Sequence, residues 1–279
     1  MKGLVNRIVD VSFVDGPGNR TAVFLQGCNF NCHYCHNPET IAPCNHCGAC
    51  VSVCPKGALH REHGTVVWNQ GDCVDCNRCL QACTHHASPK AQWMDVETLL
   101  ARIGKNRPFI QGVTVSGGEC TMQRDYLVAL GRGVQAMGLT FFLDTNGSYP
   151  LSQDTDLLAV TDGAMVDVKA SPEEAHRWLT GRGNHGVLKE VLALVQLGKL
   201  WEVRTVVSPR VLPNHTTVET VAKIVAPHQK IAPIRYKIIA YRPLGTREIC
   251  AQWESPDSQL MTQLKELAKS QGMTEVVIV

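Results

Sequence analysis

The sequence predicts an α/β protein whose parallel strands form a partial barrel of six β/α units, interrupted near its start by a cysteine-rich insert. Short apolar runs alternate with segments of helical periodicity, which is the pattern of βαβ units in a parallel sheet. Polar motifs also follow directly after all six predicted strands. The carboxyl ends of all strands of a barrel meet at one mouth, whereas an open sheet concentrates its site at one switch point. The distribution of motifs therefore favours a barrel.

The predicted strands are short runs rich in β-branched or aromatic residues: Thr21–Leu25, Val113–Val115, Thr140–Leu143, Met165–Val168, Val203–Val207 and Tyr236–Ala240. The helical segments between and after them are Val96–Ile103, Arg124–Met137, Asp154–Val160, Val187–Leu197, Thr217–Val225 and Ser258–Gln271, and a final apolar run covers Val276–Val279. Asp95 stands at a helix N-cap position, and Gly138 and Gly198 stand where glycines end helices.

Charge and cysteine content restrict the function classes. With 27 Lys and Arg against 25 Asp and Glu, the net charge of +2 provides no strong field for nucleic acid or an anionic membrane. No apolar run is long enough to span a bilayer, and Arg7 and Asp10 interrupt the stretch where a signal peptide is apolar. We therefore expect a cytoplasmic protein that binds neither nucleic acid nor membrane. Of the 13 cysteines, all except Cys120 and Cys250 lie between Cys28 and Cys83, and such density in a reducing compartment indicates metal or cluster ligation.

The insert contains a duplicated motif, C-x2-C-x2-C-x3-C, at Cys44–Cys54 and Cys73–Cys83. Pro55 follows the first copy, which matches the bacterial ferredoxin pattern, whereas Thr84 follows the second. In that pattern the fourth cysteine of each run ligates the other cluster. Cluster one would be held by Cys44, Cys47, Cys50 and Cys83, and cluster two by Cys54, Cys73, Cys76 and Cys79. Two structural zinc sites are the alternative. We predict an inserted ferredoxin-like domain with two 4Fe-4S clusters at residues 41–90, and a barrel at 1–40 and 91–279.

The first cysteine group, Cys28-x3-Cys32-x2-Cys35, differs from the other two. Three thiolates on a short loop can hold three corners of a cubane cluster and leave the fourth iron open, as catalytic metal sites require. A ligand with an amine and a carboxylate could fill that position. The alternative is a third structural site completed by His33, His36 or Cys120.

This cysteine motif, with Tyr34 before its third cysteine, resembles the signature of radical S-adenosylmethionine (SAM) enzymes. The string Phe13-Val14-Asp15-Gly16-Pro17-Gly18, together with Cys35-His36-Asn37-Pro38, is similar to that of glycyl-radical-enzyme activating proteins. These proteins are partial β/α barrels, and the insert resembles that of a ferredoxin-containing subgroup, the YjjW-type activases. The resemblance covers nearly the whole chain.

The resemblance implies roles for individual residues. Cys28, Cys32 and Cys35 would bind the catalytic 4Fe-4S cluster, whose open iron chelates SAM. Tyr34 and His36 would flank the adenine, and Glu119 of the Gly117-Gly118-Glu119 motif would accept from the SAM ammonium. The resemblance also assigns SAM contacts to the Asp167-Val168-Lys169 element, Arg204 and Arg242, and a monovalent cation to Asp144, Thr145, Met165 and Asp167. Two departures stand out, because the family commonly has proline at Cys120 and a SAM-contacting histidine at Arg242.

The implied activity is the activation of a partner glycyl radical enzyme. Reductive cleavage of SAM would yield a 5′-deoxyadenosyl radical, which takes a hydrogen atom from the α-carbon of the partner's glycine. The loop Asp15–Arg20 and the open side of the barrel are the expected entry for that glycine. An electron donor such as flavodoxin or ferredoxin would supply the electron, and oxygen sensitivity is expected. The alternatives are a radical SAM enzyme with a small-molecule substrate and a pure electron-transfer module.

Overall fold

The computed structural model describes residues 1–279, and its main feature is a nine-stranded sheet in the order β11-β10-β9-β8-β7-β6-β2-β1-β5. Its strands are β1 (Lys2–Ser12), β2 (Arg20–Leu25), β5 (Gln92–Asp95), β6 (Gly112–Gly117), β7 (Thr140–Thr145), β8 (Gly163–Asp167), β9 (Leu200–Val207), β10 (Arg235–Ala240) and β11 (Glu275–Ile278). The seven strands from β2 to β11 in this order are parallel, whereas β1 runs antiparallel to both β2 and β5. The sheet has two edges, β5 and β11, so it forms an open, mostly parallel curved layer.

All six predicted strands are confirmed, and the final apolar run forms β11. The antiparallel β1 was not predicted. It mixes polar and apolar residues, and several of its side chains are half-buried or exposed because one strand face is only partly covered. It pairs Lys2 to Val5 with β5 and thereby joins the chain before the insert to the chain after it.

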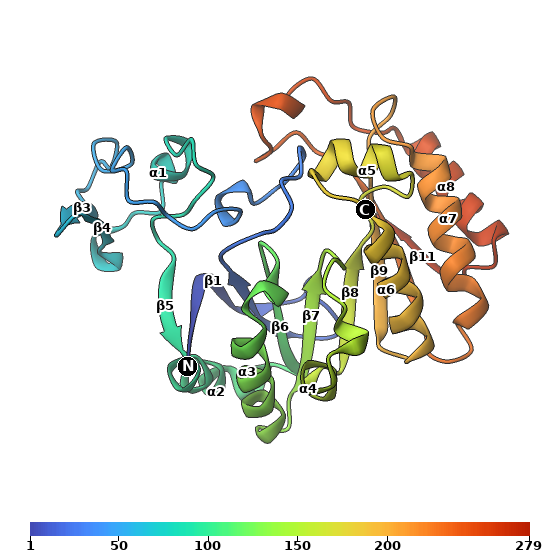
Figure 1. Ribbon diagram of the computed structural model, residues 1–279, viewed down its shortest axis with the longest axis horizontal. Coiled ribbons are helices and arrows are strands. Elements are labelled where there is room, and N and C mark those ends of the chain that lie inside the picture. The colour runs from blue at the N-terminus through green and yellow to red at the C-terminus, as the bar shows by residue number, and fades with distance from the viewer.

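Helices cover the outer face of the sheet (Figure 1). They are α2 (Val96–Asn106), α3 (Arg124–Ala136), α4 (Thr155–Val160), α6 (His185–Gln196), α7 (Asn214–Val225) and α8 (Ser258–Ser270), whereas α5 (Glu173–Thr180) lies at the carboxyl ends of the strands. Short 3-10 helices lie at Pro38–Thr40, Gln70–Asp72, Arg107–Phe109, Cys120–Gln123, Leu151–Gln153, Ala226–His228 and Glu248–Cys250. The Asp95 carboxylate caps α2 by accepting from Thr98 N at 2.8 Å, as expected. Gly138 and Gly198 follow α3 and α6 with φ of +74° and +65°, which glycine adopts without strain. Of the α-helices outside the insert, only α5 was not predicted.

Side-chain alternation separates the two faces of the sheet. Val113, Val115 and Leu143 point outward into the large core beneath the helices. Their neighbours Ser116 and Asp144 contact each other on the opposite, inner face. The arrows of β6, β7 and β8 all point toward α5 in Figure 1, so the residues at their carboxyl ends share one mouth.

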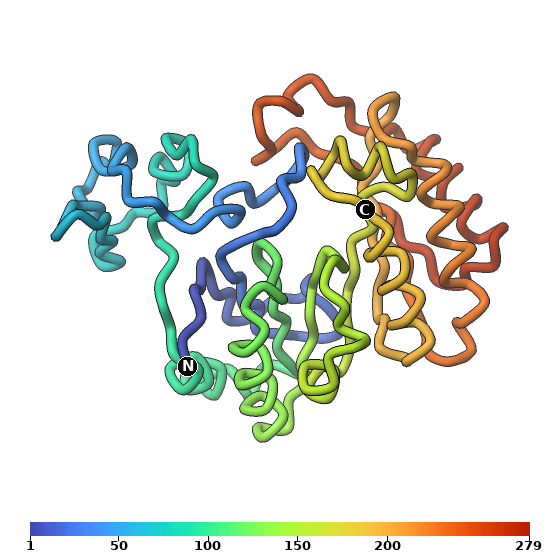
Figure 2. Tube along the Cα trace, in the orientation of Figure 1, coloured from blue at the N-terminus to red at the C-terminus, as the bar shows by residue number.

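The insert lies beside the β1–β5 edge as a series of irregular turns (Figure 2). It contains a hairpin of β3 (Leu59–Glu62) and β4 (Thr65–Trp68) and the single-turn helix α1 (Arg78–Gln81). Its own apolar cluster is centred on only Cys50, Leu59, Val66 and Cys79, which is small for a stable unit without a metal or cross-link.

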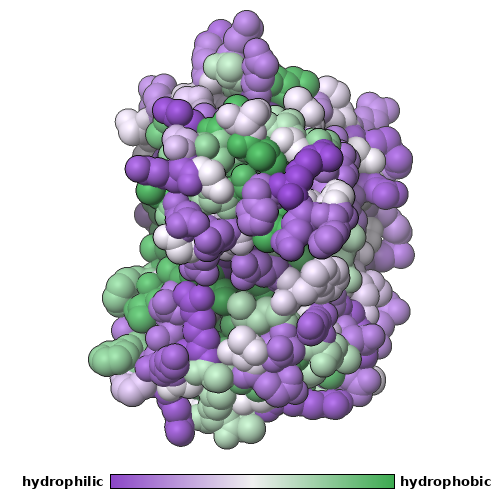
Figure 3. All heavy atoms as spheres, turned by 90° about the vertical axis from the view of Figure 1, so that its left-hand side faces the viewer, coloured by the Kyte–Doolittle hydropathy of each residue, from purple (hydrophilic) through white to green (hydrophobic).

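Polar residues prevail on the face of the molecule that Figure 3 shows, and the apolar residues on this face form small patches. No helix in the structure has the length and apolar character needed to cross a bilayer.

Candidate functional site

The first cysteine group lies on the loop that follows β2, at the mouth of the barrel. Two backbone bonds attach this loop to the end of α5, from Asn31 N to Thr180 O at 2.9 Å and from His33 N to Leu179 O at 3.0 Å. The last carbonyls of a helix have no partners within it. The end of α5, a helix that was not predicted, therefore supplies acceptors for the cysteine loop. Arg247 donates from Nη1 to the carbonyls of Asn31 and Cys32 at 3.1 and 3.3 Å. No motif pointed to this arginine.

The three thiols of the loop are held in a buried environment that disfavours their charged form. Burial raises the pKa of Cys28 to about 11 and that of Cys32 to about 12, and it also raises the pKa of Cys35. At neutral pH these groups are therefore protonated unless a metal replaces the protons. No three His, Cys, Asp or Glu side chains converge as they would around a single metal ion. The ligands of a cluster bind different irons, so they need not meet at one point.

Three residues were considered as a fourth ligand for the first cysteine group: His33, His36 and Cys120. Each of them has other contacts. His36 Nε2 lies 3.1 Å from the carbonyl of Arg242. Cys120 is fully buried, and its thiol donates to Asp144 O at 3.5 Å. Burial raises the pKa of Cys120 well above its usual value, so this thiol behaves as a small buried group. His33 packs edge-on against Trp178, with 4.8 Å between ring centroids.

Gly117 and Gly118 allow β6 to pass close to the start of the cysteine loop. Gly117 has a φ of +120°, and an added Cβ would overlap the backbone of Leu25. A Cβ on Gly118 would overlap the carbonyl of Gly27. Both positions therefore require glycine, and Gly118 N and Glu119 N donate to Leu25 O and Gly27 O at 3.0 and 2.7 Å.

The Glu119 carboxylate is 1% exposed and accepts four hydrogen bonds from N–H and O–H groups, and Oε1 also has a long contact of 4.0 Å with the Cys120 thiol. Oε1 accepts from Thr121 N, Thr121 Oγ1 and Thr145 Oγ1 at 3.1, 2.6 and 2.7 Å. Oε2 accepts only from Asn146 N, at 2.7 Å, so this oxygen has a free lone pair. Burial raises the pKa of Glu119, although the donors oppose this effect. The carboxylate is thus held in place with room for one further donor.

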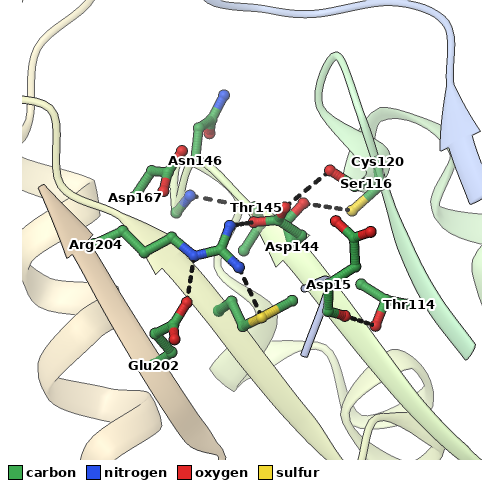
Figure 4. A network of polar contacts seen from close by, with 12 residues as sticks. Asp15, Thr114, Ser116, Cys120, Asp144, Thr145, Asn146, Asp167, Glu202 and Arg204 are labelled. Carbon is green, nitrogen blue, oxygen red and sulfur yellow. Dashed lines mark hydrogen bonds and ion pairs between the residues drawn. The ribbon is translucent and has the colours of Figure 1, made fainter. Parts of the chain in front are cut away.

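A buried network of charges lies on the inner face of β7, β8 and β9 (Figure 4). Asp144 accepts from Ser116 Oγ and from Arg204 Nη1, both at 2.9 Å. Arg204 also donates to Glu202 and to the Met165 sulfur. Burial lowers the pKa of Arg204, but its carboxylate neighbours outweigh that effect and raise it overall. Strand register explains the convergence, because Asp144 pairs with Met165 and Asp167 pairs with Arg204.

Lys169 extends the network from β8 toward the cysteine loop. Its Nζ donates to Asp167 at 2.6 Å and lies 5.6 Å from the ring centroid of Tyr34. Burial raises the pKa of Asp167, but Lys169 and Arg204 lower it below the usual value. Burial and the neighbouring Asp167 charge raise the pKa of Asp144. Of the four predicted cation ligands, the carboxylates of Asp144 and Asp167 are thus already paired with protein cations, and the Thr145 hydroxyl is committed to Glu119.

The remaining predicted SAM-binding residues occupy two kinds of position. Tyr34 is 2% exposed and packs with Tyr241 and Cys250 in a small separate core. Val168 is buried and donates from its backbone to Arg204 O at 2.9 Å. Arg242 is exposed, and its contact with His36 is made by its carbonyl.

Four cysteines of the insert face one small cavity. Cys54, Cys73, Cys76 and Cys79 line one small cavity, together with Trp68 and Lys90. Burial and the neighbouring thiols of Cys44, Cys79 and Cys83 together raise the pKa of Cys50 to about 11. Cys73 also lines a second cavity of about 500 Å³, which reaches residues of β1 and β5. All cysteines of the chain are free thiols.

Comparison with known proteins identifies related sequences and folds. Residues 22–225 match the radical SAM superfamily. The chain is 30% identical over 249 residues to the pyruvate formate-lyase-activating enzyme of Streptococcus mutans, covering 87% of this chain and 79% of that protein. It is 27% identical over 271 residues to the isethionate sulfite-lyase activating enzyme of Desulfovibrio desulfuricans, covering 88% and 85%. Among solved structures, QueE from Escherichia coli shares the fold with a TM-score of 0.55 at 16% identity, covering 100% of this chain and 94% of that one.

Proposed function

The chain belongs to the radical SAM superfamily, and we propose that it is an enzyme that activates a partner glycyl radical enzyme. The observation that carries the proposal is the cysteine loop held at the mouth of the barrel, where Lys169 lies between Tyr34 of the loop and Asp167 of the buried charge network. The relatives named as activating enzymes match over most of their length as well as most of this chain. The superfamily match and these relatives imply a 4Fe-4S cluster and SAM as cofactors.

Bound to the open iron of the cluster, SAM would supply a 5′-deoxyadenosyl radical on one-electron reduction, and this radical would take the glycine α-hydrogen of the partner. Cys28, Cys32 and Cys35 would hold the three other irons. Glu119 Oε2 has a free lone pair for an ammonium, and Arg204 has free N–H groups for a carboxylate or ribose.

The partner's glycine would reach the site from the inner face of the barrel. Support comes from the loop before β2, where the Asp15 carbonyl accepts from Thr114 Oγ1 at 2.5 Å on the inner face of β6. Figure 4 shows Asp15 beside the network that contains Asp144. A glycine loop that entered here would meet Asp15 before it reached the bound cofactor.

We also propose that the insert at residues 41–90 is a ferredoxin-like domain with two 4Fe-4S clusters. In support, the four cysteines expected for cluster two line a common cavity. Cys73 faces the larger cavity as well, which would give an electron donor such as flavodoxin or ferredoxin access to cluster two. A cytoplasmic location and a monovalent cation beside Asp144 and Asp167 stay predictions.

The activity is tested with anaerobically reconstituted, reduced protein, SAM and a glycyl radical enzyme encoded beside it. We expect 5′-deoxyadenosine and a glycyl doublet in the electron paramagnetic resonance (EPR) spectrum of the partner. If neither forms, the proposal is wrong. Formation of 5′-deoxyadenosine with label transfer from a metabolite, and no radical on a protein, would instead support a small-molecule substrate.

Iron content tests the three-cluster arrangement. Cys32→Ala should lose about a third of the bound iron and all SAM cleavage, because one of three equal clusters is removed. Cys79→Ala should lose a similar share of the iron while the catalytic cluster remains. Cys250→Ala is the matched control, since Cys250 is buried in the Tyr34 core far along the chain from the insert. Zinc in place of iron in the insert would contradict the arrangement.

A further inference from the structure

Glu202 is a buried carboxylate on the inner face of the barrel that no motif singled out. Its exposure is 1%. On β8, Ala164 pairs with Leu200 but the next residue, Met165, pairs with Glu202, so Trp201 has no partner there. An unpaired residue reverses the inward and outward alternation of a strand. Leu200 therefore packs in the outer core, whereas Glu202 faces inward with Arg204.

Glu202 lies between two arginines. Its Oε1 accepts from Arg204 Nε at 2.5 Å, and its Oε2 lies 2.7 Å from Arg235 Nε. On its far side, Arg204 donates from Nη1 to Asp144 and from Nη2 to the Met165 sulfur, both at 2.9 Å. Figure 4 shows Arg204 reaching from β9 to Asp144, with Glu202 below it.

This arrangement leaves part of the Arg204 guanidinium free. A guanidinium has five N–H groups, and three of them have protein partners. The two free N–H groups are both on Nη atoms, at the end that faces Asp144. Because the guanidinium is planar, an acceptor that fixes Nε also fixes the direction of those two groups.

We propose that Glu202 is a positioning residue that fixes the guanidinium plane of Arg204, so that its two free Nη N–H groups bind an oxygen-bearing group of SAM. The inference rests on the proposed function, because it assigns a ligand to Arg204. Two N–H groups in one plane suit a carboxylate or a pair of ribose oxygens. Glu202 itself does not touch the ligand.

The charges around Glu202 support this role. The carboxylates of Asp144, Asp167 and Glu202 are matched by the cations of Lys169, Arg204 and Arg235. Without Glu202, the charges of Arg204 and Arg235 would face each other inside the barrel with no carboxylate between them. Their repulsion would push Arg204 toward Asp144 and turn its plane, and a small misplacement of a binding group weakens binding strongly.

Two variants separate the hydrogen bond from the charge. Glu202→Gln keeps an oxygen for Arg204 Nε but removes the charge, whereas Glu202→Ala removes both. We expect Glu202→Ala to raise the KM for SAM roughly tenfold, with kcat at saturating SAM within about threefold of the wild type. Glu202→Gln should give an intermediate KM, which is a partial rescue by the conservative variant. Glu190→Gln is the matched control, because Glu190 is a buried carboxylate that bonds only to Ser152.

Binding is measured separately from turnover, through the change that SAM causes in the EPR spectrum of the reduced catalytic cluster. The SAM concentration at half-change should rise with KM in both Glu202 variants and stay unchanged in Glu190→Gln. A lower melting temperature and lower kcat with unchanged KM and unchanged half-change would mean a purely structural role, and would overturn the inference. The test needs SAM binding but no partner protein, so it is distinct from a failure to activate a glycyl radical enzyme.

Discussion

Replacement of Glu119 by glutamine is a sharp test of the site geometry, because the four N–H and O–H donors to its carboxylate cannot all be kept. Two of these donors are backbone N–H groups, one on each oxygen: Thr121 N on Oε1 and Asn146 N on Oε2. A backbone N–H cannot reverse its role, unlike a hydroxyl. Whichever way the new amide turns, its NH2 group faces a backbone donor and leaves that donor without an acceptor.

The expected cost follows from these contacts. One buried unsatisfied donor costs about 1–3 kcal/mol, and the loss of charge-assisted bonds adds to it. We therefore expect Glu119→Gln to lower the free energy of unfolding by about 2–4 kcal/mol.

Glu190→Gln provides the contrast, since the single backbone donor to Glu190 is Ser152 N and its other partner is the Ser152 hydroxyl. The hydroxyl can turn to accept from the amide, so this variant should lose less than about 1 kcal/mol. Urea unfolding followed by circular dichroism measures both variants against the wild type. Equal stabilities for the two variants would refute the reasoning about donor direction.

Three further predictions follow from single contacts. Gly117→Ala should cost at least about 2 kcal/mol in urea unfolding and lower iron retention, because a side chain at φ +120° overlaps the Leu25 backbone; wild-type stability would contradict it. Cys120→Ala should cost about 1 kcal/mol and keep the iron content, since this thiol only fills space and donates weakly; loss of iron would show that it is a ligand. Arg124 holds the pKa of Asp154 well below its usual range, so the pair stabilises the fold above the ordinary aspartate pKa, and that stability is lost as the pH falls toward the lowered value. Asp154→Asn should therefore be less stable than wild type at pH 7, with a gap that narrows below about pH 4; a gap independent of pH would refute this.

The predictions that succeeded rest on local patterns. Strand and helix periodicity located the parallel strands, because each inner strand is short, apolar on its core face and followed by a covering helix. The N-cap at Asp95 and the glycine at Gly138 were also readable, since capping depends on one residue and its immediate neighbours. By contrast, β1 and α5 are half-exposed and mixed in composition, and they are stabilised by pairing with distant segments.

The sequence by itself determined the cysteine spacing, the order of strands along the chain and the polar residues at their ends, because all of these are properties of a few consecutive residues. Only the tertiary structure decided which polar groups meet. The unpaired Trp201 turns Glu202 inward against Arg204, and Arg247 reaches the cysteine loop from the segment after β10. These contacts join residues on different strands and loops, where register and packing, rather than neighbouring residues, set the distance between two side chains.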